Sequence, residues 1–527
     1  MRLFERAKGN IGRVALHCLV LVALTGLSLT AAAADAPALF QQHCASCHGA
    51  NRVGAMGPAL LPESLSRLRK AEARQVIVDG REATQMPPFG AVLGAEEIDA
   101  LASYIYTPVL PVPSWSEADI RSSRVELHAP GSLPDKPVFD ADAMNLFLVV
   151  EAGDHHVSVL DGDKMERIHR FPSRFALHGG PKFSPDGRYV FFGSRDGWVT
   201  KYDLWNFEVV SEVRAGINTR NVAVSSDGKI VAVANYLPRT IVLFDSQLQL
   251  LKVIDAANLA GDVSSRVSAV YDAAPRKSFV AAMKDIPEIW EISYDPDAKP
   301  IFDGYVHDYK MGEGVALAGY LNPRRTVLEA PLDDFFFNQK YDTVMGASRD
   351  GKGQVVNLDV RRKIADLDIP GMPHLGSGIT WEWHGHRVLG TPNLKEGLIS
   401  IIDLETWKTV KTIRTLGPGF FMRSHEDSPY AWTDSMMSPS ARDTLQVIDK
   451  QTLEVVAQLR PEPGKTLAHV EFDRDGRYAI ASLMEKDGAL IFYDAKSLKE
   501  IKRLPASRPV GKYNLYNKIN RSEGTSH

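Results

Sequence analysis

The chain has 527 residues, of which 44% are hydrophobic and 24% are charged. This balance is typical of a soluble globular protein and excludes intrinsic disorder and collagen. The 61 basic and 65 acidic residues give a net charge of −4. A main partner of nucleic acid is therefore not expected, because tracking a phosphate backbone requires a basic excess. This length predicts several domains, or a small domain joined to a large repetitive one.

The first 34 residues have the pattern of a secretory signal peptide. Basic residues between Arg2 and Arg13 precede an apolar run over 14–29, and small residues follow before Asp35. The apolar run is shorter than the roughly 20 residues that span a bilayer, so cleavage is expected rather than a retained anchor. The mature chain is predicted to reside in the periplasm without a membrane span.

The three cysteines indicate a covalent haem. Cys18 lies in the apolar run and leaves with the signal, whereas Cys44 and Cys47 remain. Their spacing is poor for a disulfide, but Cys44-Ala45-Ser46-Cys47-His48 is the C-x-x-C-H pattern of c-type haem attachment. Both thiols would bind the porphyrin and His48 its iron. The alternatives are a thioredoxin-like pair and half a zinc site, but neither a second cysteine pair nor a βαβ pattern accompanies the motif.

The sixth iron ligand is expected from a loop some tens of residues later. Met86, in Gln85-Met86-Pro87-Pro88-Phe89, fits this place, because a thioether raises the reduction potential and prolines stiffen the loop. Met56 is an alternative ligand. Gly57-Pro58 predicts a tight turn against the axial imidazole, and the apolar spacing over 96–105 predicts a closing helix.

A repeated pattern in the rest of the chain predicts a β-propeller. A polar turn precedes a strand of small and apolar residues, as in 184–192, and a later strand often carries Asp, as Asp203 in 199–204. About eight such units, at a mean spacing of roughly 47 residues, match four-stranded blades. We therefore predict a small all-α cytochrome c domain over 35–110, a linker over 111–140 and an all-β eight-bladed propeller over 141–527.

Aligning the repeats places basic residues at one level, near the innermost strand of each blade. They are Arg174, His178, Arg220, Arg266, His374, Arg423 and His469. Alone, each is more often a solvated arginine or a histidine satisfied in a turn. Because inner strands converge on the propeller axis, their recurrence predicts a large, multiply charged anionic ligand and an imidazole that binds a metal. An iron porphyrinoid with several carboxylates fits both demands.

The sequence resembles the cytochrome cd1 family, in which a cytochrome c domain precedes an eight-bladed propeller that holds haem d1. The likeness covers nearly the whole mature chain. It is strongest over 176–205, 216–222, 372–376 and 511–517. The resemblance implies that His178 is the axial ligand of the d1 iron, that Arg174 and Arg220 bind carboxylates, and that His374 lies above the distal face.

The chain departs from the nitrite reductases of this family, which use two distal histidines. The segment equivalent to the second histidine is 330–335, Ala-Pro-Leu-Asp-Asp-Phe, with acids in its place. A carboxylate there should repel nitrite and weaken its protonation. The resemblance therefore favours the branch that dehydrogenates dihydro-haem d1, converting a propionate side chain into the acrylate of haem d1. His469 and Tyr513 match residues of that branch near the reacting side chain.

The expected reaction removes two electrons and two protons from a saturated carbon pair. No nicotinamide or flavin fingerprint is apparent, so the electrons are expected to pass to haem c and then to a periplasmic carrier. His469 or Tyr513 would take a proton, and His374 would close the distal face. Arg266 and Arg423 would also hold carboxylates, an assignment that rests on repeat register more than on the family match, and a structural role is the alternative for either. Nitrite reduction and non-catalytic haem d1 carriage remain alternatives, and a cytochrome cd1 nitrite reductase that receives haem d1 is an expected partner.

Overall fold

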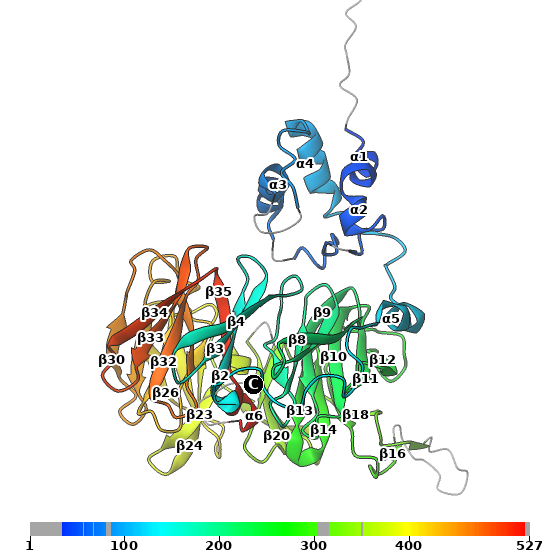
Figure 1. Cartoon of the computed structure of the whole chain (residues 1–527). Helices are drawn as coiled ribbons and strands as arrows, with labels where there is room; N and C mark the ends of the chain where they lie inside the picture. Colours follow the sequence, from blue (N-terminus) through cyan, green and yellow to red (C-terminus); the bar gives the residue numbers. More distant parts are fainter. Residues whose placement is uncertain are drawn as a thin grey trace, which may run out of the picture.

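The computed structural model describes residues 34–55, 57–66, 68–80, 86–302, 316–348 and 351–521. A helical N-terminal domain lies above one face of a β-propeller (Figure 1). Residues 1–33 of the predicted signal peptide and the alternative ligand Met56 lie outside the described residues. Within those ranges, no helix is both long and apolar enough to cross a membrane.

The N-terminal domain is built from short helices around a small apolar core. They are α1 (Ala36–His43), α2 (Ala45–His48), α3 (Lys70–Asp79) and α4 (Ala95–Tyr104). Asp35 caps α1 by accepting a hydrogen bond from the Ala38 amide at 3.1 Å. Phe40 of α1 is fully buried and meets the Tyr104 ring of α4 edge to face, with centroids 5.6 Å apart. Helix α4 therefore closes the domain, as the apolar spacing over 96–105 predicted.

Antiparallel sheets form eight blades around one axis within the described residues. The innermost strands, one per blade, are β35 (Pro509–Asn514), β5 (Lys182–Phe183), β9 (Asn218–Val224), β13 (Val267–Ala273), β19 (Asp334–Phe337), β23 (Ile379–Trp383), β27 (Met422–Arg423) and β31 (Leu467–Phe472). The second strands are β2 (Leu146–Glu151), β6 (Tyr189–Gly193), β10 (Ile230–Leu237), β14 (Ser278–Met283), β20 (Thr343–Ala347), β24 (His386–Pro392), β28 (Tyr430–Asp434) and β32 (Tyr478–Leu483).

The outer half of each blade adds two more strands. The third strands are β3 (His156–Asp161), β7 (Trp198–Asp203), β11 (Thr240–Asp245), β15 (Glu288–Ser293), β21 (Gly353–Asn357), β25 (Leu398–Asp403), β29 (Leu445–Asp449) and β33 (Gly488–Asp494). The fourth strands are β4 (Glu166–Pro172), β8 (Glu208–Arg214), β12 (Leu250–Asp255), β18 (Pro323–Val327), β22 (Arg362–Leu367), β26 (Thr409–Arg414), β30 (Val455–Leu459) and β34 (Glu500–Ala506). A separate two-stranded sheet, β16 (Ile301–Phe302) with β17 (Ala316–Leu317), extends from the fourth blade of the chain order.

Local hydrogen bonds explain why the sequence repeats. Gly187 and Gly228 lie in turns between the innermost and second strands, with φ of 72° and 71°, a left-handed conformation that favours glycine. The aspartate that ends a third strand accepts bonds from amides two and three residues later. Asp203 bonds the amides of Trp205 and Asn206 in this way, at 2.9 and 3.2 Å.

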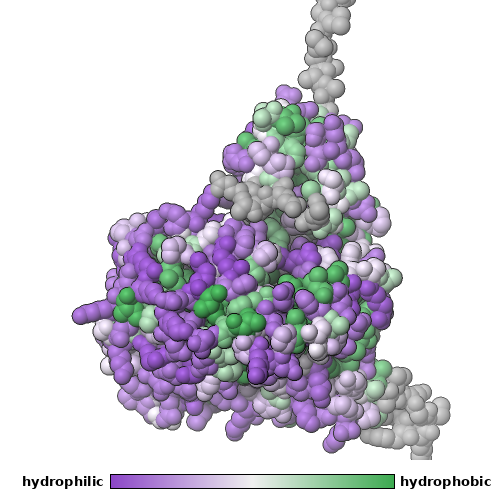
Figure 2. Space-filling view, in the orientation of Figure 1, coloured by the Kyte–Doolittle hydropathy of each residue, from purple (hydrophilic) through white to green (hydrophobic). Residues whose placement is uncertain are grey.

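Burial follows the position of a strand in its blade. Every residue of β2, β14 and β32 is buried, because both faces of these second strands are covered by neighbouring blades. The outermost strands alternate between more and less exposed residues, as in β30. Correspondingly, the outer surface in Figure 2 is mostly hydrophilic, with apolar side chains in small groups.

The C-terminal segment closes the ring. Strand β35 pairs with β2 at the start of the propeller, with Tyr513 opposite Leu148 (Figure 1, red beside cyan). The following helix α6 (Leu515–Ile519) buries Leu515 in the core of the same blade. The closure therefore brings Tyr513 to the axis.

The segment between the domains, predicted as a linker over 111–140, contains regular structure. Helix α5 (Glu117–Ser123) is followed by β1 (Val125–Glu126), which adds a fifth strand beside β8. Ser116 and Asp119 form a capping box at the start of α5. Ile120 is buried in a core formed with the propeller, which explains why the segment is ordered against a blade.

Candidate functional site

The cysteine motif lies at the junction of α1 and α2. The amides of Cys47 and His48 donate to the Cys44 carbonyl at 3.2 and 2.9 Å, a single turn that places Cys44, Cys47 and His48 close together. Burial, with a smaller contribution from Cys47, raises the pKa of Cys44 to about 11. Since a reactive redox thiol needs a lowered pKa, the thioredoxin-like alternative is disfavoured.

His48 is buried and oriented for metal binding. Its Nδ1 lies 2.8 Å from the Pro58 carbonyl oxygen, to which it donates, so Nε2 keeps a lone pair. A Cβ added at Gly57 would lie 2.9 Å from the ring of His48, so the predicted turn does pack against the imidazole. Two free thiols and an oriented imidazole on one turn are the donor set that haem c requires.

Met86 lies beside this motif. Its side chain, with those of Cys44 and Phe89, packs against the apolar core of the helical domain. The Phe89 ring also meets the ring of His43 at the end of α1, with centroids 6.1 Å apart. The loop therefore reaches the region of the cysteines, and ligation of iron by Met86 stays a prediction.

His178 lies near the propeller axis on a strained loop before β5. Ala176 has a φ of 44°, which is strained for a residue with a side chain and is typical of functional sites, whereas Gly179 and Gly180 adopt φ of 83° and 71° without strain. The ring Nδ1 donates to the Arg220 carbonyl at 2.7 Å, and Nε2 accepts from Arg195 at 2.8 Å. The proton of His178 is therefore fixed on Nδ1, and the Nε2 lone pair is the atom that a metal would take in place of the hydrogen bond from Arg195.

Arg220, on β9, lies against His178. Its Nη1 is 3.3 Å from Nε2 of His178, and its Nε donates to the Ser268 carbonyl at 2.8 Å. Burial opposes the charge of Arg220, but nearby Tyr236 and Asp334 together with other groups raise its pKa. The guanidinium therefore remains charged at the axis.

The acids predicted in place of a second distal histidine lie near His374. Asp334 on β19 accepts from Tyr271 at 2.9 Å, and Asp333 pairs with Lys284. Burial lowers the pKa of His374, and the charge of Asp334 partly opposes that shift. His374 Nδ1 donates to the Phe420 carbonyl at 2.7 Å. His374 is therefore a neutral, oriented imidazole with carboxylates nearby.

His469 lies buried near the axis, with a ring that forms no hydrogen bond to the described residues. It is 1% exposed, and neither ring nitrogen has a hydrogen-bond partner among the described residues. Its φ of 51° coincides with an irregularity in the pairing of β31, and such bulges redirect side chains. The ring lies between those of Phe421 and Tyr513, at centroid distances of 4.5 and 5.6 Å. Burial, reinforced by the charge of Lys512, lowers its pKa well below the usual value.

Tyr513 and Arg423 complete this side of the axis. Burial raises the pKa of Tyr513 to about 12, so the phenol keeps its proton. A Cβ at Gly180 would lie 2.9 Å from the Tyr513 ring, which shows how closely the His178 loop approaches it. Arg423 donates to the Met422 carbonyl at 2.7 Å, while its buried Nε has no partner within the described part of the chain.

Arg174 and Arg266 differ from the other predicted arginines. Arg174 was expected near an innermost strand, but its Nε bonds Glu212 of the fourth strand, β8, at 2.9 Å, and both line a cavity of about 230 Å³. Arg266 immediately precedes β13, and its Nε bonds Asp285 at 2.9 Å. Both guanidiniums are thus paired with carboxylates of the protein, and their binding of ligand carboxylates stays a prediction.

Three basic residues were missed by the sequence analysis. Arg195 contacts His178, Lys512 donates to the carbonyl of His469, and Lys518 lies 3.8 Å from the buried Glu471. Lys512 falls in the segment 511–517 that carries the family resemblance, and Arg195 precedes an Asp-Gly turn. The sequence therefore held a signal for Lys512 and one for Arg195. Neither residue lies at the position in the repeat where the other basic residues align.

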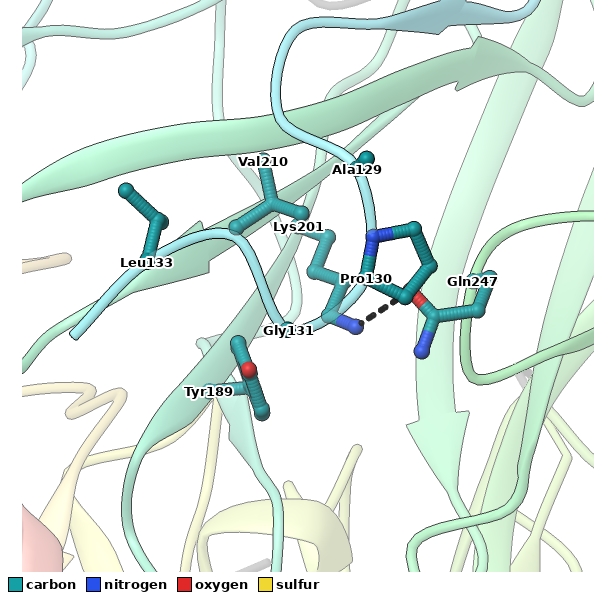
Figure 3. Close-up of a pocket in the computed structure, with 8 residues that line it drawn as sticks. All are labelled: Ala129, Pro130, Gly131, Leu133, Tyr189, Lys201, Val210 and Gln247. Carbon is teal, nitrogen blue, oxygen red and sulfur yellow. Dashed lines mark hydrogen bonds between the residues drawn. The ribbon is translucent and has the colours of Figure 1, made fainter. Parts of the chain in front are cut away.

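A second, small cavity lies away from the axis, under the segment between the domains (Figure 3). Its volume is about 40 Å³, room for little more than water. Lys201 donates to Gln247 at 3.0 Å and lies 4.1 Å from the centre of the Tyr189 ring. Burial lowers the pKa of Lys201 to about 8. The geometry of this cavity indicates anchoring of the segment around Pro130 rather than a ligand site.

The fold and these sites define a class: a c-type cytochrome domain joined to an eight-bladed propeller whose axis carries imidazole and guanidinium groups. Residues 31–105 match the family described as cytochrome c oxidase, cbb3-type, subunit III. Residues 141–518, more than half of the chain, match the family described as the cytochrome D1 heme domain. The chain belongs to the cytochrome D1 heme domain family.

Relatives extend over both domains. A dihydro-heme d1 dehydrogenase of Pseudomonas aeruginosa is 54% identical over 97% of this chain and 99% of its own. A nitrite reductase of Stutzerimonas stutzeri is 25% identical over 97% of this chain and 99% of its own. A solved structure, dihydro-heme d1 dehydrogenase NirN in complex with DHE, is 54% identical, with a TM-score of 0.85 over 92% of this chain and 99% of that chain. The predicted fold class and family are thereby confirmed.

Proposed function

We propose that the protein is a periplasmic oxidoreductase that dehydrogenates dihydro-haem d1 to haem d1. The observation that carries the proposal is His469, a buried neutral imidazole with no partner among the described residues, at an axis rich in cations. A neutral imidazole without a hydrogen-bond partner can accept a proton from a bound substrate and so act as a general base. The relative named dihydro-heme d1 dehydrogenase, 54% identical over nearly the whole chain, supports the same activity.

The helical domain would supply the electron outlet. Cys44 and Cys47 would hold a haem c through thioether bonds, and His48 would bind its iron, with Met86 as the proposed sixth ligand. When bound, this group accepts one electron at a time and passes it to an external periplasmic carrier. The Pro58 carbonyl fixes the tautomer of His48 at 2.8 Å from Nδ1, so the ligand atom needs no reorganisation.

The propeller would bind and orient the tetrapyrrole substrate. His178 would bind its iron through Nε2, in place of the hydrogen bond from Arg195, because Nδ1 is committed to the Arg220 carbonyl. Arg220 and Arg423 would pair with carboxylates of the substrate, and Arg174 and Arg266 are proposed for the same task at the periphery. Buried Arg423 gains most from such a partner, since its Nε is otherwise unsatisfied in the described structure.

His469 and Tyr513 would divide the chemical step. The phenol of Tyr513, with a pKa of about 12, is a donor at neutral pH and therefore a positioning group. His469 would act as the base. Two C–H bonds of the propionate break and one π bond forms. His469 accepts the two protons in succession and releases them to solvent, and the two electrons leave singly to the external carrier.

Charge neutralisation would raise the basicity of His469 on binding. Burial is the largest cause of its low pKa, and the charges of Lys512, Arg423 and Lys518 add to it. Carboxylates of the substrate beside these cations cancel part of that effect. The base therefore becomes effective only when the substrate is bound.

The acids near His374 disfavour nitrite reduction. Asp334 interacts electrostatically with His374, and Asp333 is next to it in the chain. An anion such as nitrite would be repelled there, and protonation would depend on His374 alone. We assign to His374 the closing of the distal face. The product would then pass to a cytochrome cd1 nitrite reductase.

The proposal is tested with the full chain carrying its covalent haem. Dihydro-haem d1 and a one-electron oxidant should give the absorption of the conjugated acrylate, with two equivalents of oxidant reduced for each product formed. Reductant and nitrite should give little nitric oxide. Abundant nitric oxide would instead establish a reductase, and binding of dihydro-haem d1 without conversion would establish a carrier.

A further inference from the structure

Arg214 joins the two domains. It is the last residue of β8, is 4% exposed, and donates from Nη2 to the Val53 carbonyl at 2.5 Å and from Nη1 to the Gly54 carbonyl at 3.5 Å. On its propeller side, Nε donates to the Asp196 carbonyl at 2.9 Å. One guanidinium therefore holds backbone from both domains at fixed spacing.

On the cytochrome side, the loop held by Arg214 is the one that carries His48. The Gly54 amide donates to the His48 carbonyl at 2.9 Å, and the Gly57 amide donates to the Cys47 carbonyl at 2.8 Å. A Cβ at Gly54 would lie 3.1 Å from Nη2 of Arg214 and 2.9 Å from the Ala59 amide nitrogen. This close packing leaves the loop little freedom to move relative to the guanidinium.

On the propeller side, the turn held by Arg214 pairs with the loop of His178. The Arg195 amide donates to the Ala176 carbonyl at 3.1 Å, and the His178 amide donates to the Gly193 carbonyl at 2.9 Å. Leu177 and Ser194 form a β-bridge between these bonds. The backbone of His178 is thus connected through residues 193–196 to Arg214, and from there to the backbone of His48.

The contacts of Arg214 fix the orientation of its guanidinium group and do not merely attract its charge. Its guanidinium lies 4.7 Å from the centre of the Trp115 ring, and the nearby Asp196 attracts it electrostatically without an ion pair among the described residues. All the acceptors named for it are backbone carbonyls, whose directions fix the planar group. Around it, Ala59 and Leu61 pack with Ile217 and Leu237, an apolar contact that has no such direction.

We propose that Arg214 is a positioning residue for electron transfer between the two sites. It sets the separation and orientation of the His48 and His178 loops, so that each electron removed from the substrate reaches the cytochrome domain. This inference rests on the proposed function. Each dehydrogenation sends two electrons singly across the interface, and an external one-electron oxidant reoxidises the cytochrome domain between them.

The test compares Arg214→Gln and Arg214→Lys with Arg188→Gln in the full chain carrying its covalent haem. Arg188 is the control, because it is buried in the same blade and donates to the Pro134 carbonyl at 3.0 Å and to the carboxylates of Asp203 and Asp135, not to the cytochrome domain. The rate at which dihydro-haem d1 reduces the covalent haem is measured by stopped flow. Hydrogen exchange over residues 49–61 is measured in the same proteins without substrate.

Arg214→Gln should slow haem reduction by about tenfold to a hundredfold and raise exchange over 49–61, with substrate affinity and haem potential unchanged. The rate of haem reduction in Arg214→Lys should lie between those of Arg214→Gln and the wild type, because the ammonium group of the lysine can still donate to one of the carbonyls. Equal rates in Arg214→Gln and Arg188→Gln would overturn the inference, as would unchanged exchange. If the wild-type haem is not reduced by substrate at all, the proposed function fails, and the exchange comparison still decides whether Arg214 docks the loop.

Discussion

The helical domain and the propeller build their sites in opposite ways. In the helical domain, Cys44, Cys47 and His48 occupy one helical turn, and a single carbonyl of Pro58 orients the imidazole. In the propeller, His178 and Tyr513 lie 335 residues apart in the sequence (513 − 178) and meet only because the C-terminal strand closes the ring. The first site is a property of a short segment, whereas the second depends on the whole fold.

Removal of the haem attachment should have the largest effect. Cys44→Ala with Cys47→Ala removes both thioether bonds, so the covalent haem should be lost and turnover should fall below detection. The propeller should still fold and bind dihydro-haem d1, because its axis residues do not depend on the cysteines. The pigment that stays with the denatured protein measures the covalent haem. The change in absorbance on addition of dihydro-haem d1 measures substrate binding. Loss of binding together with haem would break the comparison, since the sites would not be independent.

Substitution of the base should produce the next largest effect. His469→Gln should lower the rate of dehydrogenation by about a hundredfold to a thousandfold, because general base catalysis contributes about this much. Tyr513→Phe should cost only about tenfold, the value of roughly one hydrogen bond. Single-turnover formation of the acrylate measures both.

Substrate affinity serves as the control for these variants and should change little in His469→Gln. A larger loss in Tyr513→Phe than in His469→Gln would reverse the assignment of base and positioning residue. It would also show that the phenol, despite its raised pKa, is deprotonated by its surroundings when the substrate is bound.

The contrast between the regions also explains what the sequence could predict. Repeated Asp-Gly turns and terminal aspartates predicted the blades because each makes a local hydrogen-bond pattern, as Asp203 does with Trp205 and Asn206. Aligning the repeats at these turns also predicted that Arg220, Arg423 and His469 lie near the propeller axis. All three lie on innermost strands.

Partners that come from other strands could not be predicted in this way. The ion pair of Arg174 with Glu212 joins residues 38 positions apart, and nothing local in either segment indicates it. Arg195 and Lys518 likewise reach the axis from a turn and from the closing helix, outside the aligned level. The repeat therefore predicts which strands line the axis, but not which charges compensate one another around it.

Substitution of Met86 tests whether the sixth ligand of the haem c iron comes from the loop around residue 86. If Met86 is the sixth ligand, Met86→Ala should lower the reduction potential of the haem on the order of 100 mV, a part of the roughly 0.8 V that axial ligands span. Covalent attachment should be unaffected. Potentiometric titration measures the change, and Met56→Ala is the control. A potential that shifts in Met56→Ala and not in Met86→Ala would assign the ligand to Met56.

The smallest effect on the reaction is expected from a buried acid near the propeller axis, which should change the stability of the fold rather than turnover. Asp434 accepts the amides of Phe420 and Phe421 at 2.8 and 3.1 Å, and these rings contact His374 and His469. Burial raises the pKa of Asp434 to about 6.

In the unfolded chain the carboxyl of Asp434 titrates near 4, about two pH units lower, so ionisation costs the folded state about 3 kcal/mol. The protonated carboxyl of Asp434 therefore stabilises the folded state. Its contribution to the free energy of unfolding is fully present below pH 4 and is lost as the pH rises to 6. The free energy of unfolding of the wild type should therefore decline relative to that of Asp434→Asn between these values, as measured by denaturant titration of the β-sheet circular dichroism signal. Parallel curves would show that water reaches the carboxylate, and that the Phe420–Phe421 turn is held by its backbone rather than by a buried acid.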